Sequence, residues 1–211
     1  MKLLPDKTVE RLSQYRRAML KTLASGKHHI YSHEIASMLH ITPVQVRRDI
    51  MLIGYTGTLR HGYDVKELID TIGKIIDIEE GTRVAVVGAG ALGSAIIRYF
   101  NGKRAKLTIV AAFDVNPEKL NKIYAGVFCY PFEKLQAVIR DENIQIAVIA
   151  TPASETAKVA EALVNAGIKG ILNFTSSPIN ISSQVYLEEY DIVTSLEKVA
   201  YFAKQGQRRE Y

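Results

Sequence analysis

The chain has 211 residues, of which 47% are hydrophobic and 23% are charged, as in ordinary globular proteins. This much apolar material excludes a wholly disordered chain, and no apolar run reaches the roughly 18 residues that a membrane span requires. The single cysteine, Cys129, excludes a disulfide framework and a cysteine-based metal cluster. The first residues lack the apolar core of a signal peptide. We therefore expect a cytoplasmic protein with neither a membrane nor a metal partner.

Positive charge is concentrated near the N-terminus. Residues 1–62 contain ten Lys and Arg against four Asp and Glu, whereas residues 63–211 contain seventeen against eighteen. A basic segment joined to a near-neutral body favours a polyanionic partner, for which nucleic acid is the usual candidate. The alternative is a basic face that is merely solvated, and charge by itself does not separate the two.

The first part of the chain carries the periodicity of helices. Apolar residues recur at helical spacing in four segments, 8–24, 32–39, 43–53 and 64–77. Ser32 is placed to cap the second helix, and Asp64 to cap the fourth. At the start of the third, Thr42 suits the N-cap, Pro43 the first helical position and Gln45 the reciprocal place in a capping box. The glycines within 54–63 predict turns and a short hairpin.

Helices followed by a glycine-rich wing are typical of a winged helix-turn-helix. The capped helix over 43–53 would be the recognition helix, with Gln45, Arg47 and Arg48 pointing outward. Arginine can bridge guanine O6 and N7, and glutamine can pair with adenine. Arg60, in the predicted wing, would reach a phosphate or the minor groove. Double-stranded DNA is therefore the favoured partner, with ordinary surface charge as the alternative.

After residue 82 the pattern changes to alternating strands and helices. Nearly continuous apolar runs predict strands over 83–88, 107–114, 127–130, 144–151 and 169–175. Helical periodicity fills the intervals 91–101, 132–142 and 154–166, and returns in the tail over 195–205. Such alternation predicts a doubly wound parallel sheet of the Rossmann type, covered on both faces.

A glycine motif joins the first predicted strand to its helix. It is a G-x-G-x-x-G formed by Gly88, Ala89, Gly90, Ala91, Leu92 and Gly93. A glycine turn at this place lets a pyrophosphate approach the backbone and the helix N-terminus. Asp114 ends the second strand, at the distance expected of a carboxylate that binds the adenine ribose. The motif therefore predicts NADH or NAD⁺ as the ligand, with NAD(H) preferred over NADP(H).

Thr151 and Pro152 close a later strand of the same sheet. Because the carboxyl ends of parallel strands border the ligand crevice, they are candidates for the nicotinamide half of the dinucleotide. A merely structural strand end is the alternative. The motif could also be a glycine turn without a ligand.

The second half has no histidine that could serve a dehydrogenase as proton donor or acceptor beside the nicotinamide. All five histidines lie in the first 61 residues. His29 and His33 have the spacing of metal ligands, but no acid or cysteine completes a known pattern. Binding without turnover is therefore favoured. The alternatives are an NAD-dependent dehydrogenase with a helical N-terminal extension and a DNA-binding protein that no longer responds to nucleotide.

Several segments together resemble the Rex family of redox-sensing transcriptional repressors: 46–49, 111–114, 166–174 and 196–202. The resemblance covers nearly the whole chain. It implies a homodimer that represses genes from inverted-repeat operators and leaves the DNA when NADH binds. It also implies three parts, namely a winged-helix DNA-binding domain over 1–80, an NAD(H)-binding Rossmann domain over 81–193 and a C-terminal helix, 194–211, that is exchanged between subunits.

The resemblance further implies three switch residues. Tyr99 resembles a tyrosine near the nicotinamide, and Asp191 resembles an acid that pairs across the dimer with an arginine equivalent to Arg17. The wing departs from the family pattern, since Thr58 and Leu59 stand at its basic positions and Arg60 replaces a glycine. The loop over 173–178 departs as well.

Overall fold

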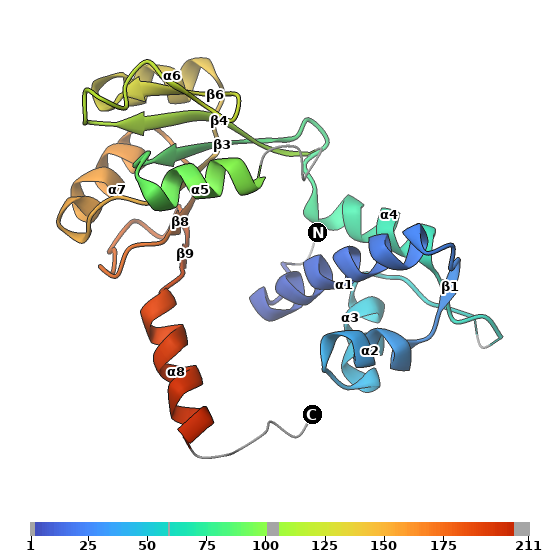
Figure 1. The fold of residues 1–211 in the computed structure, drawn as a ribbon. Helices are drawn as coiled ribbons and strands as arrows, with labels where there is room; N and C mark the ends of the chain where they lie inside the picture. Colours follow the sequence, from blue (N-terminus) through green and yellow to red (C-terminus); the bar gives the residue numbers. More distant parts are fainter. Residues whose placement is uncertain (1–2, 59, 101–105, 205–211) are drawn as a thin grey trace. The chain divides into compact units, whose positions relative to one another are not determined.

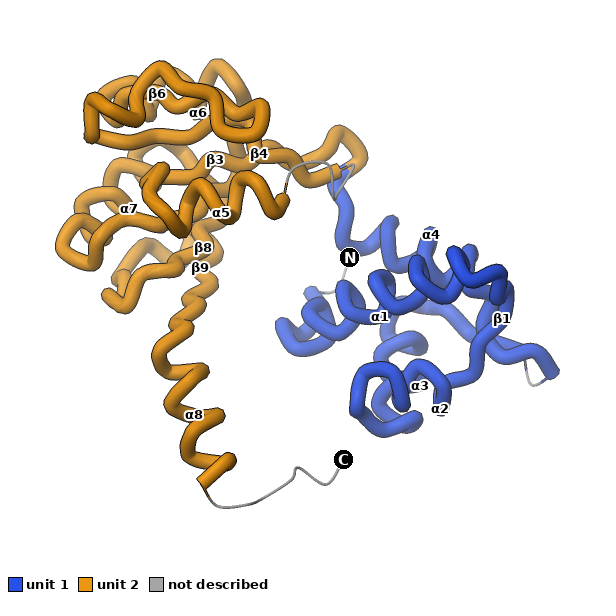
Figure 2. Tube along the Cα trace, viewed as in Figure 1, with its two compact units in different colours: residues 1–78, 209–211 blue, residues 79–208 orange. Residues whose placement is uncertain are grey.

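The computed structural model describes residues 3–58, 60–100 and 106–204 (Figure 1). They divide into two compact units, with the boundary between Ile78 and Glu79 (Figure 2). The first unit is mostly helical and the second is built on a parallel sheet. Each is described by itself.

The first unit consists of four helices and a two-stranded sheet: α1 (Asp6–Ala24), β1 (His29–Ile30), α2 (Ser32–Leu39), α3 (Pro43–Leu52), β2 (Tyr63–Asp64) and α4 (Val65–Ile76). β1 and β2 are antiparallel, and Thr58 bridges Gly62 in the connection between α3 and β2. Helices α2 and α3 with this hairpin form the predicted winged helix-turn-helix. Side chains from all four helices fill its core, and those with no exposed surface include Leu12, Met19, Ile35, Ile50, Leu68 and Ile72.

Two of the predicted helix starts are capped as expected. The Thr42 hydroxyl accepts the backbone N–H of Gln45 at 3.2 Å, and the Asp64 carboxylate accepts that of Glu67 at 2.8 Å. The reciprocal half of the capping box at α3 was wrong. The Gln45 amide instead donates to the Asp49 carboxylate one turn further on, at 2.9 Å. A buried carboxylate needs donors, and this need directs the amide inward.

The prediction that Ser32 caps α2 was also wrong. Ser32 is the first helical residue, and the carboxylate of Glu34 accepts the backbone N–H of Tyr31 at 2.9 Å. The short strands β1 and β2 carry no periodic signal. Their pairing is extended by Val65, whose backbone N–H donates to the carbonyl of His28 at 2.9 Å.

The second unit contains seven strands with helices between them. Its elements are β3 (Thr82–Val87), α5 (Ala91–Phe100), β4 (Leu107–Asp114), β5 (Ile123–Tyr124), β6 (Val127–Pro131), η1 (Phe132–Lys134), α6 (Leu135–Asp141), β7 (Ile146–Ile149), η2 (Ala153–Glu155), α7 (Thr156–Asn165), β8 (Gly170–Asn173), β9 (Tyr186–Glu189) and α8 (Ile192–Lys204).

The strand order of the sheet is β5-β6-β4-β3-β7-β8-β9. Every pair is parallel except β5 with β6. Without β5, this is the strand order of a Rossmann fold. Strands β4 and β6 are added on one side of β3, and strands β7, β8 and β9 are added on its other side. The predicted fold class is therefore confirmed. The edge strands β5 and β9 were missed because one is very short and the other is rich in polar residues.

The apolar run over 84–87 in β3 reflects burial on both faces. Val84 and Val86 belong to the core under α5, together with Ile97. Ala85 and Val87 belong to the core under α6 and α7. Successive side chains of a strand alternate between faces, so a strand covered twice is apolar throughout. Figure 1 shows α5 on one side of the sheet and α6 and α7 on the other.

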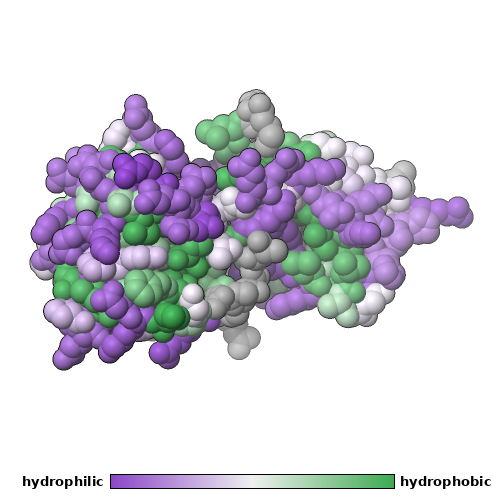
Figure 3. All heavy atoms as spheres, turned by 90° about the horizontal axis from the view of Figure 1, so that it is seen from above, coloured by the Kyte–Doolittle hydropathy of each residue, from purple (hydrophilic) through white to green (hydrophobic). Residues whose placement is uncertain are grey.

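None of the described helices is long and apolar enough to cross a bilayer. The face drawn in Figure 3 is predominantly hydrophilic, with smaller hydrophobic areas scattered over it.

Candidate nucleotide and DNA sites

The glycine motif forms a tight turn at the end of β3. Gly88 has a φ of +97°, and a Cβ there would stand 2.5 Å from the carbonyl oxygen of Ala150. A Cβ on Gly93 would overlap the carbonyl oxygen of Gly88. At Gly90, by contrast, a Cβ would find only the ammonium of Lys119 within 4 Å, at 3.9 Å. Two of the glycines are therefore required by packing, and the middle one leaves an open approach to the backbone.

Asp114 lies beside this turn, as the motif predicts. Its Oδ2 accepts the backbone N–H of Ala89 at 2.8 Å, and its Oδ1 accepts that of Asn116 at 2.8 Å. Lys119 Nζ lies 3.2 Å from Oδ2. Burial disfavours ionisation of Asp114, but the two backbone donors and the ammonium outweigh it and hold the pKa below its ordinary value. The side chain is thus a carboxylate held in a fixed orientation.

A cavity of about 530 Å³ opens between the glycine turn and the carboxyl ends of β4 and β7. It lies where the strand order reverses, the usual ligand crevice of an open parallel sheet. Predicted site residues in its lining are Gly88, Gly90, Leu92, Asp114, Thr151 and Pro152. Lining residues that the sequence argument missed include Lys119, Phe132, Glu155, Lys158 and Phe174. They follow the strand ends at varied distances, so no motif marks them.

The hydroxyl of Thr151 carries a second sign of a ligand. Its Oγ1 is buried in the wall of this cavity and has no hydrogen-bond partner within the described residues. An unpaired buried hydroxyl costs about 1–3 kcal/mol, which a ligand donor or acceptor would recover. The open backbone at Gly90, the oriented carboxylate of Asp114 and this hydroxyl together fit a dinucleotide.

The remaining predicted residues of the motif have structural places. Ala89 supplies the N–H that holds Asp114, Ala91 begins α5, and Gly93 packs against the turn.

The three predicted switch residues lie apart in sequence and element. Tyr99 is in the last turn of α5, 68% exposed, and is not among the residues that line the cavity. Asp191 immediately precedes α8, where its carboxylate accepts the backbone N–H of Val193 at 2.8 Å and the hydroxyl of Thr194 at 2.6 Å. These contacts lower the pKa of Asp191. Arg17 is exposed on α1 in the first unit.

The outward face of α3 carries two of the predicted DNA-binding residues. Arg47 and Arg48 are exposed, and Arg47 also donates to the hydroxyl of Ser32 at 3.1 Å. Arg60 is exposed in the wing, where its carbonyl accepts the hydroxyl of Tyr31 at 3.0 Å. Gln45 is a correction, since its amide points inward to Asp49 instead of outward.

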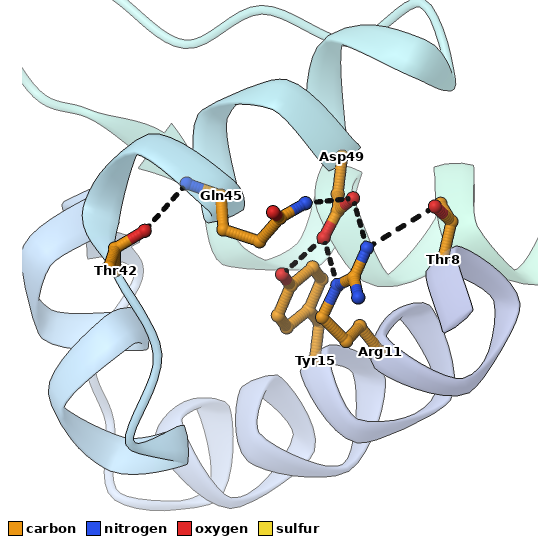
Figure 4. A network of polar contacts seen from close by, with 6 residues as sticks. All are labelled: Thr8, Arg11, Tyr15, Thr42, Gln45 and Asp49. Carbon is orange, nitrogen blue, oxygen red and sulfur yellow. Dashed lines mark hydrogen bonds and ion pairs between the residues drawn. The ribbon is translucent and has the colours of Figure 1, made fainter. Parts of the chain in front are cut away.

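Asp49 is the centre of a polar network that the sequence argument missed (Figure 4). Its side chain has no exposed surface. It accepts hydrogen bonds from the Arg11 guanidinium, from Gln45 and, at 2.7 Å, from the Tyr15 hydroxyl. Burial opposes the charge, but these donors lower the pKa of Asp49 overall. Burial and the carboxylate in turn raise the pKa of Tyr15. The network therefore joins α1 to the helix that carries Arg47 and Arg48.

Two protein-family models match this chain, one in each of its two units. The family model described as "CoA binding domain" matches residues 79–177, and the model described as "Putative DNA-binding protein N-terminus" matches residues 4–50. The redox-sensing transcriptional repressor Rex of Bacillus licheniformis is 33% identical over 98% of this chain and 96% of its own length. Rex of Lactobacillus gasseri is 34% identical over 94% and 93%.

The chain belongs to the Rex family of redox-sensing transcriptional repressors. Its family is thus one of DNA-binding regulators and not of enzymes. Solved structures of a Rex-family repressor match nearly the whole chain. RSP, a Rex-family repressor, in complex with β-NAD⁺ and operator DNA superposes with a TM-score of 0.89, at 27% identity, over 98% of this chain and 95% of that one. RSP in complex with β-NADH superposes with a TM-score of 0.86. The predicted family is confirmed.

Proposed function

We propose that this chain represses transcription by binding operator DNA through its first unit and that NADH, bound by the second unit, releases it. The observation that carries the proposal is the cavity at the β3–β4–β7 strand ends, which brings Gly90, Asp114 and Thr151 together in a chain that also has a basic winged helix-turn-helix. The complexes of RSP with operator DNA, β-NAD⁺ and β-NADH support it. A repressor of this kind would act in the cytoplasm.

Each nucleotide-site residue has a role that follows from its chemistry. The turn from Gly88 to Gly93 receives the diphosphate, because its backbone is open at Gly90 and leads into the N-terminus of α5. Asp114 accepts the ribose hydroxyls of the adenosine half. Thr151 and Pro152 border the nicotinamide half. NADH and NAD⁺ differ in the charge of that ring, which is the property a redox sensor must distinguish.

The DNA-binding residues divide into two kinds. Arg47 and Arg48 on α3 contact base edges in the major groove, and Arg60 in the wing contacts a phosphate or the minor groove. Gln45 supports them by holding Asp49, so it serves the orientation of α3 first. In this proposal residues 1–80 are the DNA-binding domain, residues 81–193 the nucleotide domain and residues 194–211 the dimer-exchange helix.

The exposed apolar side of α8 supports a homodimer. Leu196 is 63% exposed and Val199 64% exposed, and no residue of α8 is buried. On the α5 side of the sheet, Ile146 of β7 and Leu172 of β8 remain only partly buried, and among the described residues no helix lies between β8 and β9 along the chain. A helix of α8's character from a second copy would cover such a surface. In that dimer Arg17, Tyr99 and Asp191 would form the contacts that distinguish its two states.

The experiment is a titration of the protein on a labelled inverted-repeat DNA at fixed salt, because phosphate contacts make the affinity strongly salt-dependent. NADH should release the DNA and NAD⁺ should not. The Asp114→Ala variant should bind DNA like the wild type and need more NADH for release. Absence of operator binding with either nucleotide would overturn the proposal. Turnover of a hydroxy acid or an aldehyde would instead favour the dehydrogenase alternative.

A further inference from the structure

Lys119 is a cation in the nucleotide cavity that no sequence motif marks. It follows β4 by five residues, and its side chain is 33% exposed. Its ammonium lies 3.2 Å from Asp114 Oδ2 and is the atom nearest to the open side of Gly90. Lys119 therefore stands between the carboxylate that would receive the ribose and the glycine that would receive the diphosphate.

Asp114 does not depend on Lys119 for its orientation. Each carboxylate oxygen already accepts one backbone N–H, from Ala89 or from Asn116, at 2.8 Å. These donors belong to the turn and to the loop after β4, so they fix the carboxylate from two sides. The contact with Lys119 is longer, at 3.2 Å, and its donor is the ammonium at the end of a flexible side chain. The ammonium can therefore leave Asp114 without releasing the carboxylate.

The charges of the residues that line the cavity indicate a role for Lys119. Among the described lining residues the cations are Lys119 and Lys158, and the acids are Asp114 and Glu155. The lining is therefore neutral with Lys119 and carries a net negative charge without it. A diphosphate brings two negative charges into this space, where partial burial strengthens like-charge repulsion. The ammonium beside Gly90 is the group placed to oppose that repulsion.

We propose that Lys119 is the phosphate-binding cation of this site, held by Asp114 until a ligand arrives. The ribose hydroxyls then donate hydrogen bonds to the Asp114 carboxylate, and the ammonium moves from Asp114 to the diphosphate at Gly90. This inference rests on the proposed function, because it assigns a role within the same nucleotide site. The chemistry it recognises is a phosphate on adenosine, which a dinucleotide and coenzyme A share.

The test compares ligands with and without phosphate. Affinities of ADP-ribose and adenosine are measured by competition with NADH fluorescence for the wild type, Lys119→Met and Lys122→Met. Lys122 is exposed, three residues further along and outside the lining, so it is a matched control. Lys119→Met should weaken ADP-ribose about tenfold, the size of one charge-assisted contact, and leave adenosine unchanged. The Lys119→Arg variant should restore most of the ADP-ribose affinity.

Other outcomes separate this inference from the proposed function. An equal loss for adenosine and ADP-ribose would overturn the inference, because Lys119 would then act on the ribose through Asp114. Unchanged affinity for both ligands would overturn it as well. A wild-type protein that binds no NADH would contradict the proposed function. If coenzyme A binds better than ADP-ribose and loses affinity in Lys119→Met, the phosphate role stands and the dinucleotide assignment fails.

Discussion

The Arg11 guanidinium donates two hydrogen bonds to the Asp49 carboxylate, from Nε to Oδ2 at 2.6 Å and from Nη2 to Oδ1 at 2.8 Å. The pair joins α1 to α3, and Tyr15 and Gln45 complete the acceptor positions of the carboxylate. Because Asp49 lies between the exposed Arg48 and the buried Ile50, this contact sets the rotation of α3 about its axis. The face that would meet DNA is thus fixed from inside the unit.

Removing the carboxylate should destabilise the first unit. Asp49→Ala leaves Arg11 and the Tyr15 hydroxyl with unmet donors, so we expect a loss of about 3 kcal/mol in the free energy of unfolding. Urea unfolding followed by helical circular dichroism measures it. Asp70→Ala, an exposed acid on α4, is the control and should change the stability by less than about 0.5 kcal/mol. Equal stability of the two variants would show that the network contributes little.

The same network predicts a dependence of stability on pH. The pKa of Asp49 is lowered in the folded chain, so the unfolded chain binds this proton more readily. The stabilisation is therefore fully present above the ordinary carboxylate pKa of about 3.9 and is lost as pH falls through the lower folded pKa. Unfolding free energies measured between pH 6 and 2.5 should fall more steeply for the wild type than for Asp49→Asn. Parallel curves would exclude this contribution.

Substitutions at two glycines of the turn should have different effects, one on NADH binding and the other on stability. A Cβ at Gly90 meets only the flexible end of Lys119, at 3.9 Å, so Gly90→Val should keep the stability of the second unit and weaken NADH binding by at least tenfold. A Cβ at Gly93 overlaps the carbonyl of Gly88, so Gly93→Ala should cost about 1–3 kcal/mol of stability. Thermal unfolding and NADH fluorescence separate the two effects. If both variants lose binding and stability together, Gly90 does not face the ligand.

The effect of substituting each arginine of α3 on operator affinity should depend on whether that arginine contacts a base or a phosphate. Arg47→Ala and Arg48→Ala should each weaken operator binding by about 1–3 kcal/mol if the arginine reads a base edge, and relax the preference at that base pair. A residue that meets only a phosphate would weaken all sequences alike and reduce the salt dependence. Fluorescence anisotropy on operator and scrambled DNA at several salt concentrations distinguishes these cases. Lys66→Ala, exposed on α4, is the control.

The exposed side of α8 should control association. Leu196→Asp and Val199→Asp place a charge in the apolar surface, and burying an unpaired charge is costly, so each should shift a dimer toward the monomer. Size-exclusion chromatography with light scattering measures the mass. Glu197→Lys, between them on the same helix, changes charge without entering the apolar stripe and should leave the dimer intact. A monomeric wild type would contradict the exchanged-helix proposal.

The sequence by itself determined the features whose causes are local. Periodicity and capping placed α3 and α4, because a helix start is satisfied by residues three positions away. The glycine turn and Asp114 were predicted together, because a strand, a turn and the next strand end follow each other closely along the chain. The apolar run of β3 predicted burial on both faces.

Only the tertiary structure decided which distant side chains meet. Asp49 reads as a surface acid beside two arginines, yet it is buried because Arg11 and Tyr15, more than thirty positions earlier, supply its donors. Lys119 reads as ordinary loop charge, and only the packing of β4 against β3 brings its ammonium to Gly90. Long-range pairing depends on how elements pack, and neither periodicity nor spacing carries that information.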